Sequence, residues 1–193
     1  MSKTDILNAA KTLLWETGYQ SMSPRKVMDA SGAGQGSLYH HFRSKQDLAE
    51  AALDDIEQEM TAAAEALLGG SQAPMAKIKA YLLLERKGLK GCRLGRLANE
   101  SEVIGEPGMR SRIAKYFVGV EALLARALRD AQQTDQLPQT LDVHDLACTL
   151  ASVVQGGFLL SRILQDSEEI SKATKGAMAL VQAVQTAHTA RHR

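Results

Sequence analysis

The sequence predicts an all-α protein of about nine helices, in which a small three-helix module precedes a larger helical domain. Apolar residues recur at spacings of three and four nearly everywhere along the chain, which is the period of amphipathic helices. The 193 residues include only four prolines, and 45% of them are hydrophobic, so helices can form around a substantial core. No strand-like alternation or internal repeat stands out. We place the boundary between the two parts near residue 50.

Composition narrows the class of protein further. The 23 basic and 22 acidic side chains leave a formal charge of +1, so no strong overall field draws the chain to nucleic acid or anionic lipid. The two cysteines, Cys92 and Cys148, exclude a disulfide scaffold and suit a reducing compartment. No stretch reaches the roughly 18 apolar residues of a membrane span, and no signal peptide is expected. We therefore expect a cytoplasmic protein without a membrane partner.

The first helices are short and begin or end at recognisable capping residues. Apolar positions in residues 6–17 predict a first helix, and Gly18 is expected to end it in the left-handed conformation. Ser23 followed by Pro24 is the N-cap and N1 pair favoured at a helix start. The second helix is expected to end by Gly32.

Further caps divide the rest of the chain. Gly34 is expected to cap a third short helix that runs through Phe42. Ser44 caps a fourth, with Asp47 at its third position, where a carboxylate favours the helix dipole; this helix ends at the Gly-Gly-Ser break of residues 69–71. The remaining helices are predicted at Pro74–Lys87, around Leu94–Ser101, at Met109–Gln133, and after caps at Asp142 and Ser167.

Residues 21–48, SMSPRKVMDASGAGQGSLYHHFRSKQDL, have the form of a helix-turn-helix, with a tight turn that contains two glycines. Val27 and Met28 are expected to pack the first of its helices, while Leu38 and Phe42 of the second point inward. Small residues near the start of the second helix let its backbone approach a groove of DNA closely. Gln and Ser side chains suit base edges, and Tyr, His and Lys side chains suit phosphates.

This stretch resembles the TetR family of bacterial transcriptional regulators. The run Gly36-Ser37-Leu38-Tyr39-His40-His41-Phe42, then Ser44-Lys45-Gln46-Asp47-Leu48, carries the resemblance together with the first helix. The resemblance implies an all-helical homodimer, with a DNA-binding domain at residues 1–50 and an effector-binding and dimerisation domain at residues 51–193. The expected function is a ligand- or redox-responsive regulator, a repressor that an effector releases from a palindromic operator.

Site residues carry over from the family by position. Gln35, Gly36 and Ser37 are expected to face bases. The expected phosphate contacts are Ser23, Arg25, Tyr39, His40 and Lys45. Gly34 stands where the family usually has a Ser or Thr cap, and Gln35 stands where Lys or Arg is frequent, so the operator sequence cannot be copied across.

Cys92 is a candidate thiol sensor because five cations surround it in an eleven-residue window: Arg86, Lys87, Lys90, Arg93 and Arg96. Positive charge, and a helix starting at Cys92, would favour the reactive thiolate. The alternatives are a small buried residue beside solvated cations, or a basic patch that binds an anionic effector such as a carboxylate or an acyl-CoA.

Residues on the fifth, seventh and eighth helices are candidates to line an effector pocket, although core packing explains any one of them singly. They are Tyr81, Met109, Tyr116, Phe117, Leu150, Val154 and Phe158. The resemblance implies that the last two helices form the dimer interface, where a close helix approach would explain Gly156-Gly157. Effector binding or Cys92 modification is expected to shift the fourth helix and change the separation of the recognition helices.

Two other classes stay open. The first is a helical small-molecule-binding or scaffold protein that no longer binds DNA specifically, since residues 1–50 carry six basic and five acidic side chains, whereas DNA-binding domains are usually more basic. The second and least supported is an enzyme built around Cys92 and His144. No cofactor is expected, and no metal site either, because His144 and Cys148 supply two ligands alone.

Overall fold

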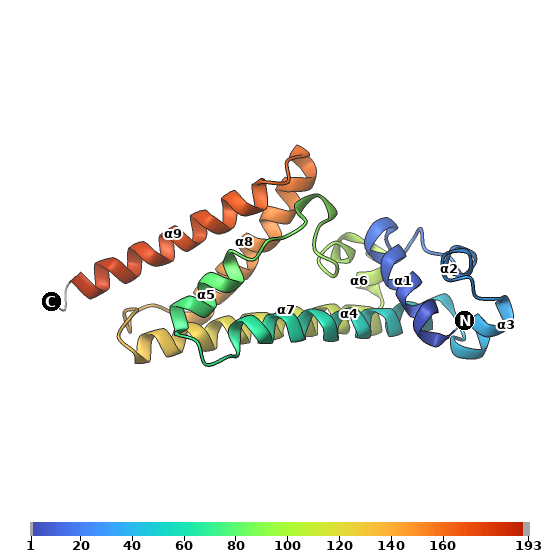
Figure 1. The fold of residues 1–193 in the computed structure, drawn as a ribbon, viewed down its shortest axis with the longest axis horizontal. Coiled ribbons are helices and arrows are strands. Elements are labelled where there is room, and N and C mark those ends of the chain that lie inside the picture. The colour runs from blue at the N-terminus through green and yellow to red at the C-terminus, as the bar shows by residue number, and fades with distance from the viewer. Residues whose placement is uncertain (1, 191–193) are drawn as a thin grey trace. The chain divides into compact units, whose positions relative to one another are not determined.

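The computed structural model describes residues 2–190, and within them it contains nine α-helices, two 3-10 helices and no strand. The all-α class and the predicted number of helices are confirmed. The α-helices are α1 Lys3–Thr17, α2 Pro24–Ser31, α3 Gln35–His41, α4 Lys45–Leu68, α5 Pro74–Leu82, α6 Ser101–Gly105, α7 Pro107–Gln133, α8 Val143–Leu164 and α9 Glu169–Ala190, as Figure 1 labels them. The 3-10 helices are η1 Gly88–Lys90 and η2 Leu97–Asn99.

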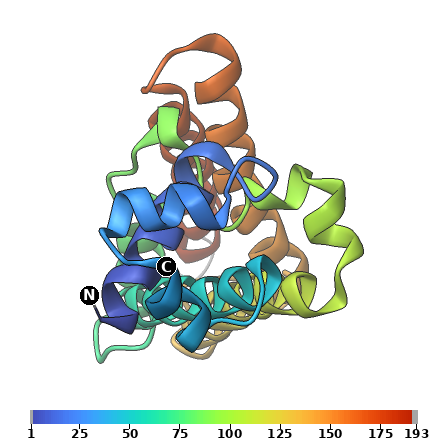
Figure 2. The same cartoon turned by 90° about the vertical axis from the view of Figure 1, so that its right-hand side faces the viewer.

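The chain divides into two compact units, and neither unit is one continuous segment. The first unit joins the residues up to Met60 to Cys92–Tyr116. The second joins Thr61–Gly91 to the residues from Phe117 onward. The first unit therefore holds α1, α2 and α3, which Figures 1 and 2 draw in blue, together with η2, α6 and the first parts of α4 and α7.

Most predicted caps are present in the structure. Ser23 accepts a hydrogen bond from the Lys26 N–H, with Pro24 at the start of α2. Ser44 accepts one from the Asp47 N–H at 3.0 Å. Asp142 accepts from the N–H groups of His144 and Asp145 at the start of α8. Because each cap depends on residues within three positions of it, the sequence reveals it.

Gly18 differs from its predicted conformation. It follows α1 with φ 84° and ψ 171°, so φ is positive as expected, but ψ lies outside the left-handed helical region. Glycine is still the residue that this backbone requires, because a side chain is strained at such a φ.

Helix α5 ends at Leu82 and not near Lys87 as the periodicity predicted. The physical reason is the side chain of Arg86, whose guanidinium donates to the carbonyl oxygens of Tyr81 at 2.6 Å, Leu82 at 3.0 Å and Leu84 at 3.0 Å. The bonds to Tyr81 and Leu82 satisfy carbonyl groups that the end of a helix leaves without an intrahelical partner. The side chain of a residue after the helix thus replaces a further helical turn.

The predicted helix around Leu94–Ser101 is also wrong. Residues 93–96 form turns, η2 follows, and the α-helix begins only at Ser101. Side chains in this stretch bond to distant parts of the first unit, as described below, so local periodicity does not determine its conformation. α7 begins at Pro107, two residues before the predicted start, because proline suits the first turn of a helix.

A close approach between α8 and α9 explains one glycine of the predicted Gly156-Gly157 pair. A Cβ atom on Gly157 would lie 2.9 Å from the Ile170 Cα, whereas one on Gly156 would meet nothing within 4 Å. The fully buried Ser161 Oγ accepts a hydrogen bond from the Ile170 N–H at 3.1 Å at the same crossing. The close contact at Gly157 is thus an intramolecular one between α8 and α9, whereas Gly156 has open space beside it.

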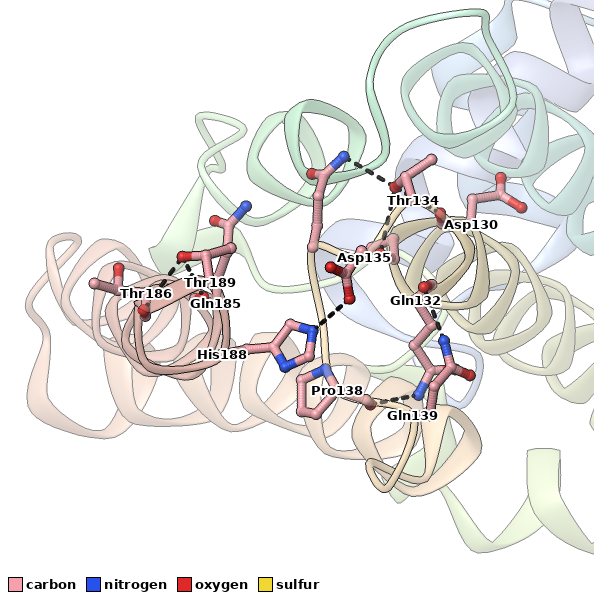
Figure 3. A network of polar contacts seen from close by, with 12 residues as sticks. Asp130, Gln132, Thr134, Asp135, Pro138, Gln139, Gln185, Thr186, His188 and Thr189 are labelled. Atoms are coloured by element: carbon pink, nitrogen blue, oxygen red, sulfur yellow. Dashed lines mark hydrogen bonds and ion pairs between the residues drawn. The ribbon is translucent and has the colours of Figure 1, made fainter. Parts of the chain in front are cut away.

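Polar contacts fix the loop between α7 and α8 within the second unit (Figure 3). Gln132 donates to the carbonyl oxygens of Pro138 and Leu141 at 2.9 and 2.8 Å. His188 of α9 lies 2.9 Å from the carboxylate of Asp135, a residue with φ 54°. The loop is therefore bonded both to α7, through Gln132, and to α9, through His188.

We expect Gly157→Ala to lower the free energy of unfolding by about 1–3 kcal/mol, because the added methyl group meets backbone atoms of α9. Gly119→Ala is the matched control, since a Cβ on Gly119 within α7 would meet nothing within 4 Å. Alanine there should raise stability by about 0.5–1 kcal/mol. Urea denaturation at one protein concentration measures both, and equal effects would contradict the close approach at Gly157.

Candidate nucleic-acid interface

The turn between α2 and α3 determines how these two helices meet. Gly32 ends α2 in the left-handed conformation, with φ 71° and ψ 10°, which glycine adopts without steric cost. The N–H of Ala33 then donates to Ser31 Oγ at 3.2 Å. Two short helices joined by a tight turn with a left-handed glycine have the geometry of a helix-turn-helix.

Apolar side chains hold this pair of helices from within. Val27 of α2, Leu38 of α3 and Phe42 after α3 are all buried, while Met28 is partly buried. The inward orientation predicted for Leu38 and Phe42 is confirmed. Since α3 has only seven residues, its stability comes from this packing and not from its own hydrogen bonds.

Most of the residues predicted to contact DNA are accessible to solvent. Arg25, Gln35, Gly36, Tyr39 and His40 are exposed, and Ser23, Ser37 and Lys45 are partly buried. Cβ atoms built on Gly34 and Gly36 would meet nothing within 4 Å, so the start of α3 presents open backbone. A flat, small-residue helix start with polar side chains around it can enter a groove of DNA closely.

Lys45 is held at the turn between α1 and α2. Its Nζ lies 4.2 Å from the centre of the Tyr19 ring and donates to the Gln20 carbonyl oxygen at 3.4 Å. A cation over an aromatic face is attracted to it, so the ammonium group has a preferred place on the first unit. Lys45 is the first residue of α4, so this contact joins the start of α4 to the turn between α1 and α2.

Glu100, which the sequence analysis did not single out, binds the same turn. Its Oε1 accepts from the Tyr19 N–H at 3.0 Å and its Oε2 from the Gln20 N–H at 2.9 Å. A Cβ on Gly18 would lie 2.5 Å from Glu100 Oε1. Because the partners are about 80 positions apart, no local pattern in the sequence indicates this contact.

An ion network joins α1 to α4 within the first unit. The buried Lys11 donates to Asp55 at 2.5 Å and to Glu59 at 2.7 Å, and Arg93 donates to Glu59 at 2.6 Å. Burial alone lowers the pKa of Lys11, but its bonds to Asp55 and Glu59 raise the pKa above its ordinary value. The bond from Lys11 lowers the pKa of Glu59, and Arg93 adds to the effect against the opposing influence of burial.

Cys92 does not begin a helix, so that part of the thiol prediction is wrong. The thiol is 6% exposed and its Sγ accepts from the Gly95 N–H at 3.3 Å. Among the neighbouring cations, Arg86 bonds to carbonyl groups at the end of α5, Arg93 bonds to Glu59, and Arg96 bonds to the Trp15 carbonyl oxygen. Of these cations, Arg93 and Arg96 share the first unit with Cys92, whereas Arg86, Lys87 and Lys90 belong to the second unit.

The seven predicted effector-pocket residues are divided between the units. Met109 and Tyr116 belong to the first unit and the other five to the second. Tyr81, Met109, Tyr116, Leu150 and Val154 are buried, and Phe117 and Phe158 are partly buried.

Two grooves open on the second unit. One, of about 450 Å³, is apolar and lies between α8 and α9, with Leu137 and Leu141 of the α7–α8 loop beside it. Of the seven predicted residues it contains Leu150. The other, of about 690 Å³, is formed by residues 83–90 and 167–175 and carries four cationic and two acidic side chains.

One helix of the described residues, α8, is long and apolar enough to cross a membrane by length and composition. It was not expected from the sequence, where Asp145 and Arg162 interrupt the apolar run. A third of its most apolar window is buried inside the chain, and a helix that packs in a protein core meets the same criteria.

Two family models match the chain. Residues 6–52 match the model for bacterial regulatory proteins of the tetR family, and residues 72–177 match the tetracyclin repressor-like C-terminal domain. The second match alone spans more than half of the 193 residues.

Curated proteins and solved structures are similar over nearly the full length. The HTH-type transcriptional regulator YxaF of Bacillus subtilis (strain 168) is 27% identical over 172 residues, 86% of this chain and 87% of the relative. The HTH-type transcriptional regulator UidR of Escherichia coli (strain K12) is 24% identical over 191 residues, 96% of this chain and 94% of the relative. The crystal structure of reduced E. coli NemR superposes with a TM-score of 0.80 at 25% identity, covering 94% of this chain and 95% of the other. The two curated relatives are transcription regulators and not enzymes.

We expect Glu59→Gln to reduce stability at neutral pH and to have little effect in acid. Because the pKa of Glu59 is lowered in the folded state, its carboxylate stabilises the fold above its unfolded pKa, and this contribution is lost as the pH falls through the folded pKa. Urea denaturation at pH 7 and at pH 3 measures the difference. Glu65→Gln, an exposed acid of the same helix, is the control. An equal loss for Glu59→Gln at both pH values would show that the ion network is not its cause.

Proposed function

The chain belongs to the TetR family of bacterial regulatory proteins, a family of DNA-binding transcription regulators, and we propose that it is a homodimeric repressor that an effector releases from a palindromic operator. The observation that carries this proposal is the surface of α2 and α3. Leu38 and Phe42 are buried while the polar residues of α3 are exposed. α3 is therefore held by its buried side chains, and its exposed polar side chains are available to enter the major groove.

The roles of individual residues follow from their position on that surface. We propose that Gln35, Gly36 and Ser37, at the start of α3, face base edges. Five residues around them are proposed to hold phosphates: Ser23, Arg25, Tyr39, His40 and Lys45. Residues 1–50 carry a net charge of +1, so these few contacts, with helix N-termini, supply the attraction that the domain as a whole lacks.

The proposed dimer interface is the outer face of α8 and α9. On α8, Gly156 is open and Leu159 and Ile163 are 56% and 65% exposed; on α9, Gly176 is open and Leu180 is 71% exposed. Glycines beside large exposed apolar residues suit close packing against the same helices of a second copy, an isologous contact. Such a dimer would present two α3 helices to half-sites about 34–36 Å apart.

The effector is proposed to act on residues 51–193. A ligand releases DNA only if it binds the free conformation more tightly than the DNA-bound one. The proposed lining is the five predicted residues of the second unit, Tyr81, Phe117, Leu150, Val154 and Phe158, with a shift of α4 as the route to the recognition helices. Modification of Cys92 is the second candidate, prompted by the five cations near it in the sequence. A solved relative is described by its reduced form, while the burial of Cys92 favours a ligand over the thiol.

We expect the wild-type protein to bind DNA flanking its own gene at least ~10³ times more tightly than unrelated DNA of equal length near 150 mM salt. Arg25→Gln should weaken binding to both DNAs and reduce the salt slope by about one. Gln35→Ala should weaken operator binding alone, by about 1–3 kcal/mol. Fluorescence anisotropy measures all three, with Arg126→Gln, an exposed cation of α7, as the charge control.

The same assay separates the alternatives. Equal, weak and salt-insensitive binding to every DNA, with genomic fragments included, would favour the scaffold class. Loss of operator binding on adding a thiol reagent, in wild type but not in Cys92→Ser, would favour redox control over a ligand.

We expect Leu180→Glu to give a monomer and to weaken operator binding, because a buried charge opposes the α8–α9 interface and a single half-site binds poorly. Val118→Glu is the matched control, since Val118 on α7 is 66% exposed and Leu180 is 71% exposed. Sedimentation velocity measures the mass of each variant. If both variants stay dimeric, the interface lies elsewhere.

A further inference from the structure

We propose that Glu100 is a positioning residue for DNA binding: its carboxylate fixes the turn between α1 and α2, and through that turn it sets the place of Lys45 at the predicted phosphate surface. The inference rests on the proposed function, since it assumes that Lys45 contacts DNA. Glu100 lies outside residues 1–50 and between η2 and α6. All of the residues involved belong to the first compact unit.

The contact between Glu100 and the turn is specific. Two oxygens of one carboxylate accept from two consecutive N–H groups, those of Tyr19 and Gln20, at 3.0 and 2.9 Å. Bonds from backbone N–H groups to an ionised carboxylate are among the stronger hydrogen bonds in proteins. Gly18 leaves the space that the carboxylate occupies, because any Cβ there would lie 2.5 Å from Oε1.

The same two residues of the turn hold Lys45. The Tyr19 ring lies under its Nζ at 4.2 Å, and the Gln20 carbonyl oxygen accepts from it at 3.4 Å. Tyr19 and Gln20 are thus each bound to Glu100 through the backbone N–H, and each contacts Lys45 through another group, the ring of Tyr19 and the carbonyl oxygen of Gln20. If the carboxylate is lost, the turn is free to rotate and the ammonium group loses its fixed place.

Electrostatics alone predicts the opposite effect of removing this acid. A carboxylate near the DNA-binding surface repels phosphates, so its neutralisation should tighten DNA binding. Glu102 provides the comparison, because it is exposed on α6, two residues from Glu100. Burial is the main cause of the raised pKa of Tyr19, and the charge of Glu102 adds to it, so Glu102 acts on the same turn through space.

The test is fluorescence anisotropy of the full chain on two duplexes, an operator fragment selected by the wild-type protein and an unrelated duplex of equal length at low salt. The variants are Glu100→Gln, Glu100→Asp and the control Glu102→Gln, each also made with Lys45→Gln. Thermal unfolding midpoints are measured for all of them. Glu100→Asp keeps the charge and shortens the reach, so it separates the contact from the charge.

We expect Glu100→Gln and Glu100→Asp to bind both duplexes about tenfold more weakly, with a salt slope lower by about one. Glu102→Gln should bind as tightly as wild type or more tightly. In the Lys45→Gln background, the effect of the Glu100 substitutions should largely disappear, since the two residues act as one unit.

Three results would overturn the inference. Tighter or unchanged binding by Glu100→Gln would show that only its charge matters. An undiminished loss in the Lys45→Gln background, or one that follows the unfolding midpoint across the variants, would show a general structural role. If the wild-type protein selects no operator fragment and does not bind the unrelated duplex, the proposed function fails together with the inference; normal wild-type binding with any of the other results contradicts the inference alone.

Discussion

A helix of seven residues has no stability of its own in water, and the recognition helix α3 is such a helix. It exists because Leu38 and Phe42 lie in the core of the first unit, and because Gly32 turns the chain from α2 into it. The exposed side chains of α3 do not take part in this packing. This division explains how a surface can carry small and polar residues that would not by themselves form a helix.

Charged groups from distant parts of the chain join the other elements of the first unit to one another. Lys11 of α1 bonds to Asp55 and Glu59 of α4, and Arg93 bonds to Glu59 from a segment that follows α5. Pairs of this kind contribute little when fully exposed, but Lys11 is 9% exposed and its ammonium group is bonded to two carboxylates. Loss of one partner would leave a buried charge without full compensation.

The sequence predicted those features that neighbouring residues determine. The caps at Ser23, Ser44 and Asp142 each bond to an N–H within three positions, so they could be read from the sequence directly. The exposure of α3 followed from the spacing of Leu38 and Phe42. The confirmed fold class has the same origin, because apolar periodicity is local information.

Features that depend on contacts between distant residues could not be predicted from the sequence. The side chain of Arg86 ends α5, and the stretch after Gly91 is shaped by bonds to Glu59 and Trp15. Gly156 and Gly157 are adjacent and chemically identical, yet only one of them faces α9. The role of Glu100 depends on a turn about 80 positions earlier. No window of sequence contains both partners of such a contact.

The discontinuity of the first unit has a consequence for biosynthesis. Domains at the N-terminus generally fold first as a chain leaves the ribosome, but here α1–α3 precede the arginines and the glutamate that bond to them. A nascent chain of about 60 residues has Lys11 and Glu59 but lacks Arg93, Arg96 and Glu100. The contacts that Arg96 and Glu100 make with Trp15, Tyr19 and Gln20 therefore form only after about half of the protein has been synthesised.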